Sequence, residues 1–261
     1  MARLKPADFD DRLTVVEHLD ELRTRIVICV GALVVATAAC FWQNKTLLEI
    51  ANRPLPASVE EPITLHPAEA LLTTLTVAIV AGLILALPVI IYQAYAFILP
   101  ALAPTERRTV MPFMVASPIL FIIGVVFAYY VLMPVAMQFL LNFNASEFNI
   151  EVRARDYYSF LTISLAAIGI LFQVPVGIMA LTSLGIVTPD QLAKNRRYAI
   201  LVIAVVSALV TSPDPATMVL SMLPVYLMYE GSIWLARWVG RSKDAEEGEA
   251  APADEPAAES G

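Results

Sequence analysis

The sequence predicts an all-α, polytopic membrane protein with six transmembrane helices, and three observations support this fold class. First, 58% of the 261 residues are hydrophobic and only 16% are charged, which leaves too little polar surface to cover a soluble globule of this size. Second, long apolar runs alternate with polar, proline-rich breaks. Third, Lys and Arg concentrate in alternate breaks, as they do in loops on the cytoplasmic side of a membrane.

The N-terminal segment, residues 1–25, is polar and contains a short helical stripe of apolar side chains. The stripe predicts an amphipathic helix that lies at the membrane surface and runs into a first span at about residues 26–42. Residues 43–70 hold four prolines and are predicted to form a loop. A second span is predicted at about residues 71–99, where Pro88 should kink the helix.

Two polar breaks separate the predicted third, fourth and fifth spans. The third span covers about residues 110–133 and is followed by a second polar loop, residues 140–159. Aromatic residues at the end of this loop are predicted to form an interfacial belt: Tyr157, Tyr158 and Phe160. The fourth span, about residues 161–184, is interrupted by Gln173 and Pro175.

The C-terminal part of the chain is predicted to be a short hairpin of two spans. Thr188 is placed to cap a helix that has Pro189 at its first position. The fifth span, residues 198–211, is roughly 20 Å long, well short of a hydrocarbon core of about 30 Å. A tight turn leads to the last span, residues 216–238, in which Glu230 either snorkels to the interface or pairs with Arg237.

The chain is thus divided into a membrane domain, residues 26–238, between the N-terminal segment and an acidic tail, residues 239–261. The tail has the composition of a disordered segment and supplies most of the net charge of −7. The remainder is close to neutral, so the sequence predicts no nucleic-acid partner. Without a cluster of Cys or His it also predicts no metal, no cofactor and no catalytic centre.

The distribution of Lys and Arg predicts the orientation in the membrane. Thirteen of the 17 cationic residues lie on the side of the termini and four lie in the loops of the other side. Positively charged loops face the cytoplasm, so both termini are expected to be cytoplasmic.

Two charged motifs on the predicted cytoplasmic side carry the functional argument. One is residues 17–25, in which Glu21 and Arg25 have the spacing of an ordinary helical ion pair. The other is residues 97–108, in which Glu106 would favour the first turn of a helix that begins near Pro104. Taken singly, each motif is explained better by these structural roles than by a binding function.

Taken together, the two motifs closely resemble those of the TatC family, the multispanning subunit of the twin-arginine protein translocase. The first reads His-Leu-x-Glu-Leu-Arg-x-Arg and the second reads Phe-Ile-x-Pro-Ala-Leu-x-x-x-Glu-Arg-Arg. The resemblance continues in order through residues 88–93, 127–130, 172–176, 185–189 and 212–214 and covers roughly residues 13–238.

This resemblance implies a receptor that binds twin-arginine signal peptides of folded cargo proteins. The matching positions are Glu21, Arg23, Phe97, Glu106 and Arg107. Carboxylates bind a guanidinium through two parallel hydrogen bonds, so the two glutamates are interpreted as acceptors and Phe97 as an apolar wall. The two arginines would orient the carboxylates or bind peptide carbonyls.

The resemblance also implies a non-enzymatic protein of the plasma membrane, spanning the lipid bilayer in a multimeric complex. TatA-like and TatB-like single-span subunits would join it, and the proton-motive force would drive export. Gln173 stands where many relatives carry glutamate; it is expected either to bind a polar partner helix or to pack between helices. Asp214 is expected either to cap a helix or to contact a partner.

The sequence argues against two other functional classes. A secondary transporter of a small solute is the main alternative, but the spans show no internal repeat and have few charges at the membrane centre. An intramembrane hydrolase would need a serine with a histidine beside it, and both histidines lie outside the predicted spans.

Overall fold

The computed structural model describes residues 15–56, 59, 61–98, 104–148, 150–183, 185–210 and 215–249, without the side chains of residues 15–17, 98, 104–110, 183, 210, 216 and 238–249. In this part of the chain the regular structure is helical, apart from a single bridge between Ile63 and Arg153. The helices are α1 Val15–Trp42, α2 Asn44–Asn52, α3 Glu69–Ile98, α4 Pro104–Phe127, α5 Met133–Asn142, α6 Ala154–Leu171, α7 Val174–Ser183, α8 Pro189–Lys194, α9 Arg196–Val210 and α10 Pro215–Glu249. A π-helical turn, η2 Ala128–Leu132, joins α4 to α5.

Five stretches of the described chain are long and apolar enough to cross a membrane. They are His18–Trp42, Glu69–Phe97, Met111–Asn142, Ala154–Thr182 and Thr217–Arg237. The predicted all-α membrane fold is therefore confirmed. Helix α9 has 15 residues, or about 22 Å, so the count of six spans stays a prediction.

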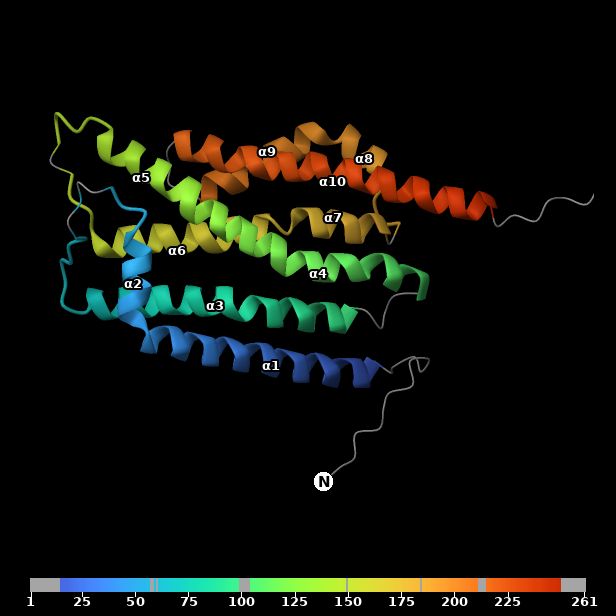
Figure 1. Cartoon of the computed structure of the whole chain (residues 1–261), viewed down its shortest axis with the longest axis horizontal. Helices are drawn as coiled ribbons and strands as arrows, with labels where there is room; N and C mark the ends of the chain where they lie inside the picture. The colour runs from blue at the N-terminus through green and yellow to red at the C-terminus, as the bar shows by residue number, and fades with distance from the viewer. Residues whose placement is uncertain are drawn as a thin grey trace, which may run out of the picture.

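The long helices lie roughly along one axis, so that each end of the bundle gathers distant parts of the chain (Figure 1). The start of α1, the end of α3 and the start of α4 lie at one end, which we call the α1 end. The starts of α3 and α6 lie with α2 at the opposite end, which we call the α2 end. This arrangement places the two charged motifs of the sequence at the same end of the molecule.

Helices α1 and α3 pack against each other with a close approach at Gly82. A Cβ atom at this position would lie 2.5 Å from Thr37 Oγ1 and 2.7 Å from Thr37 Cα. Backbone atoms cannot yield as a flexible side chain can, so glycine is required for α1 to lie this close to α3. Apolar residues on the other faces of α1, such as Val34 and Val35, remain exposed, as expected for a lipid-facing helix.

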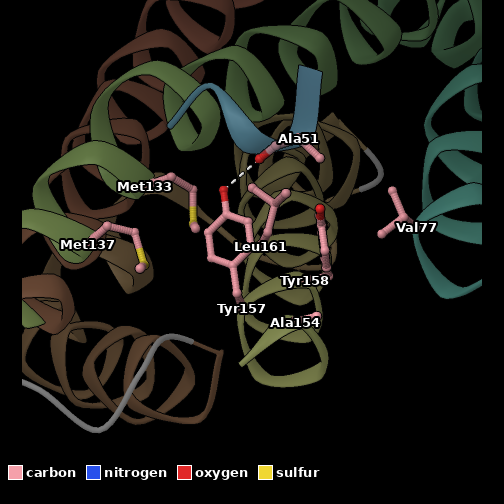
Figure 2. Packing of buried hydrophobic residues seen from close by; sticks show 8 residues of the cluster. All are labelled: Ala51, Val77, Met133, Met137, Ala154, Tyr157, Tyr158 and Leu161. Carbon is pink, nitrogen blue, oxygen red and sulfur yellow. Dashed lines mark hydrogen bonds between the residues drawn. The ribbon is translucent and has the colours of Figure 1, made fainter. Parts of the chain in front are cut away.

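Tyr157 and Tyr158 belong to the core, so the predicted interfacial aromatic belt is wrong for these two residues. They are only 3% and 6% exposed, and their hydroxyls donate hydrogen bonds to Ala51 O (2.5 Å) and Asn52 Oδ1 (2.7 Å). Figure 2 shows Tyr157 reaching across the core to the end of α2. Residues 43–70, which we predicted to form a loop, thus contain helix α2. The apolar face of α2 packs against α3 and α6.

Replacing Tyr157 by phenylalanine is expected to destabilise the protein by about 1 kcal/mol. The change removes one buried hydrogen bond and leaves the Ala51 carbonyl without its tyrosine donor. Thermal unfolding of the detergent-solubilised protein measures the effect. Tyr130→Phe is the matched control, because that side chain is 68% exposed, and an equal loss in both variants would contradict the assignment.

The C-terminal helices agree with the prediction at the Thr188 cap and differ from it in the partner of Glu230 and in the end of α10. Thr188 caps α8 as predicted and forms a capping box with Gln191. Glu230, for which we predicted either snorkelling to the interface or pairing with Arg237, accepts from Arg196 Nε at 2.8 Å and from Tyr226 OH at 3.0 Å. The predicted pairing with Arg237 is therefore wrong. Arg237 instead contacts Asp190 at 3.1 Å, so the two ion pairs join α9 and α8 to α10. Helix α10 itself continues to Glu249, past the predicted start of the tail at residue 239.

Candidate functional site

The α1 end of the molecule carries a cluster of five side chains from α1 and α3, which we call the α1–α3 cluster: His18, Glu21, Arg25, Gln93 and Phe97. Glu21 Oε1 accepts hydrogen bonds from Arg25 Nε at 3.0 Å and from Arg25 Nη2. Arg25 Nη1 donates to Gln93 Oε1 at 3.1 Å. A single guanidinium therefore holds the Glu21 carboxylate and ties α1 to α3.

The second oxygen of Glu21 is positioned differently from the first. Glu21 Oε2 is buried and has no hydrogen-bond partner among the described residues, although His18 Nδ1 lies 3.8 Å away. A buried carboxylate oxygen that lacks a donor loses solvation without compensation. Because Oε1 is already engaged by Arg25, Oε2 is the atom of this cluster best placed to accept a hydrogen bond from an incoming cation.

An aromatic pair forms the wall beside this carboxylate. The rings of His18 and Phe97 stack with centroids 4.2 Å apart and an interplanar angle of 14°. Their contact spans the α1–α3 interface, so it fixes the position of Phe97 relative to Glu21. Apolar walls reduce access of water and thereby strengthen charge-assisted hydrogen bonds at the carboxylate.

The structure brings two of the predicted site residues, Glu21 and Phe97, into this one cluster. Arg23 is exposed on α1. Glu106 and Arg107 lie in the first turn of α4, at the same end of the bundle, but their side chains are outside the described residues (Figure 1). Asp214 also lies outside the described residues, and its predicted role stays a prediction.

Sequence reasoning missed the parts of this cluster that join the two helices. Arg25 was read as a helical ion-pair partner and membrane anchor, and the structure adds its bond to Gln93 on α3. His18 and Gln93 occur within the motifs that carry the family resemblance, but nothing in their spacing indicates a contact across 68 or more positions. Only the packing of α1 against α3 reveals their roles.

Gln173 lies away from this cluster, at the break between α6 and α7. Its Nε2 donates to Ser117 O at 3.0 Å, and its Oε1 accepts from the Ser117 hydroxyl. The amide is thus hydrogen-bonded to α4 of the same chain at both ends, which supports the helix-packing interpretation of this residue. Its binding to a partner helix remains untested.

The α1–α3 cluster has the chemistry of a binding surface. It offers a carboxylate oxygen, an aromatic wall and a guanidinium that holds the carboxylate in place. In the described part of the chain, no group of three or more Cys, His, Asp or Glu residues could hold a metal ion.

Comparison with known proteins agrees with the resemblance seen in the motifs. The model of the family described as "Sec-independent protein translocase protein (TatC)" matches residues 17–224. Among curated relatives, the TatC protein of Magnetococcus marinus is 36% identical over 245 residues, covering 92% of this chain and 90% of the relative. The TatC protein of Escherichia coli is 34% identical over 242 residues, with 91% and 94% covered.

Solved structures give the same result at the level of the fold. Two crystal structures described as the twin arginine translocase receptor TatC have TM-scores of 0.75 and 0.76 and sequence identities of 36% and 37%. They cover 85% and 84% of this chain, and the matches include 99% of each solved chain.

Proposed function

The chain belongs to the TatC family of Sec-independent protein translocase proteins, and from this premise we propose that it is the receptor for twin-arginine signal peptides. As a translocase component it is not an enzyme. Family membership also leaves no reason to retain the alternative of a small-solute transporter.

The observation that carries the proposal is the buried Oε2 of Glu21, which has no hydrogen-bond partner among the described residues and lies beside the stacked rings of His18 and Phe97. In the proposed complex, one arginine of the signal peptide donates to Glu21 Oε2 and packs along Phe97. The other arginine pairs with Glu106, which the first turn of α4 carries at the same end of the bundle. Arg25 keeps Glu21 oriented, and Arg23 and Arg107 bind carbonyls of the peptide.

The proposal also covers the orientation of the protein in the membrane, the number of its spans and its partner subunits. The α1 end faces the cytoplasm, as the distribution of Lys and Arg favours, and the protein crosses the plasma membrane six times with α9 as the short fifth span. A span of about 22 Å would thin the bilayer around α9 and α10. TatA-like and TatB-like subunits would assemble on the outer surfaces of the bundle.

Photocrosslinking in membrane vesicles tests the receptor role. A peptide with two consecutive arginines and a photoreactive residue beside them is expected to crosslink to α1 and to the start of α4. Replacing Glu106 by alanine should abolish the crosslink while the protein still inserts into the membrane.

Glu49→Ala is the matched control, since Glu49 is an exposed acidic residue on α2, at the other end of the bundle. It should leave the crosslink unchanged. Crosslinking that maps to the α2 end, or that survives Glu106→Ala at full strength, would refute the proposed site.

A further inference from the structure

A cavity of about 400 Å³ lies at the α2 end, far from the candidate receptor site. Its wall is made by the chain leading into α3 and by the first turns of α3 and α6. The lining residues include His66, Glu69, Leu72, Thr73, Arg153 and Arg155.

The acidic residue of this cavity, Glu69, is fully engaged within the protein. Its side chain is 5% exposed, and Oε1 accepts from Arg153 Nε at 2.9 Å and from the Arg155 backbone N–H at 3.2 Å. Oε2 accepts from Arg153 Nη2 at 3.2 Å and from the Leu65 backbone N–H at 3.1 Å. The hydrogen bonds that Arg153 donates to Glu69 raise the pKa of the Arg153 guanidinium, so the two charges remain and cancel each other.

Three other groups of the lining, on Thr73, His66 and Arg155, are donors available to a ligand. Thr73 is 7% exposed, and its hydroxyl makes no hydrogen bond to a described residue. His66 Nδ1 accepts from the Ala68 backbone N–H at 3.2 Å, which places the proton of the neutral imidazole on Nε2. Arg155 forms no ion pair with any residue that the structure describes. With Glu69 neutralised by Arg153, Arg155 is the remaining Arg, Lys, Asp or Glu side chain among the residues that line the cavity.

The position of the cavity indicates where its ligand comes from. Glu69 and Ala154 are the first residues of two membrane-spanning stretches, so the cavity lies at the boundary between hydrocarbon and water. Leu72, one turn further along α3, is 60% exposed and continues the cavity wall as an apolar surface toward the membrane. The phosphate groups of lipids lie at this depth, directly above their acyl chains.

We propose that this cavity binds the phosphate group of an anionic phospholipid, with Arg155, Thr73 and His66 Nε2 as its donors and the acyl chains against Leu72. Phosphate oxygens accept several hydrogen bonds at once and match a guanidinium in charge and geometry. The proposal does not rest on the signal-peptide proposal, because the two sites lie at opposite ends of the bundle.

Native mass spectrometry of the full-length protein, released from a non-ionic detergent, tests this site. Dioctanoyl phosphatidylglycerol should bind at one equivalent, and dioctanoylglycerol, which has the same chains without the phosphate, should bind at least about tenfold more weakly. Arg155→Gln should weaken phosphatidylglycerol binding about tenfold, and Thr73→Val about threefold. Arg53→Gln, which removes an exposed cation at the same end of the bundle but outside the cavity, should leave it unchanged.

Three results would overturn the proposal. Equal binding of the two lipids would show that the phosphate group is not recognised. An equal loss in Arg155→Gln and Arg53→Gln would show only a general effect of surface charge. Displacement of the lipid by millimolar inorganic phosphate alone would identify free phosphate as the ligand of this cavity and would refute its assignment to a lipid.

Discussion

Replacing Glu106 by glutamine is expected to weaken binding of a paired-arginine peptide by roughly 30-fold, or about 2 kcal/mol. The substitution preserves the size of the side chain and removes the charge, so one peptide guanidinium loses its bidentate carboxylate. Fluorescence anisotropy of a labelled peptide with the full-length protein in detergent measures the change. The contribution of Glu106 to the start of α4 is small in comparison, so thermal unfolding should shift little.

Glu49→Gln serves as the control for the loss of one negative charge. Glu49 lies on α2 at the opposite end of the bundle, so this variant should bind the peptide as the wild type does. Unchanged affinity in Glu106→Gln, with the protein folded, would show that Glu106 does not contact the arginines.

The second large effect is expected from Gly82→Leu. A side chain here meets the backbone of Thr37, so α1 must move away from α3, at a cost of about 1–3 kcal/mol. The same displacement would separate His18 from Phe97 and Arg25 from Gln93. Peptide affinity should therefore fall together with thermal stability, although Gly82 itself is not part of the α1–α3 cluster.

Gly31→Leu is the matched control on the facing helix. Gly31 is also in a helix, and a Cβ atom there would have no atom within 4 Å. The Gly31→Leu variant gains the same helix-favouring side chain without a clash, so its thermal stability and its peptide affinity should be retained. If Gly82→Leu behaved in the same way, close packing of α1 on α3 would not be what positions the cluster.

The parts of the fold that the sequence predicted well are those governed by local patterns. Hydropathy located the long helices, and proline and polar residues marked the breaks, including the interruption at Gln173 and the cap at Thr188. Helix α2 was missed because the nearby prolines suggested a loop, whereas its apolar residues are stabilised by contacts with α3 and α6. Such tertiary contacts override local propensity.

The same division applies to the functional site. Family motifs selected Glu21 and Phe97, and the structure places both in the α1–α3 cluster. The bonds between Arg25 and Gln93 and between Tyr157 and Ala51 join residues 68 and 106 positions apart, so no local pattern predicts them. The interfacial role predicted for Tyr157 was wrong for the same reason, since aromatic residues at a span end are equally suited to a core that offers a backbone acceptor.

The central claim is that Glu21 Oε2 and the Glu106 carboxylate at the α1 end together recognise two guanidinium groups, with Glu106 as the bidentate acceptor. The most direct test compares two peptides that differ only in carrying two arginines or two lysines, titrated against the full-length wild-type protein. Because a lysine ammonium cannot form the two parallel bonds of a guanidinium, we expect the lysine peptide to bind at least about tenfold more weakly. Equal affinity for the two peptides would contradict the account.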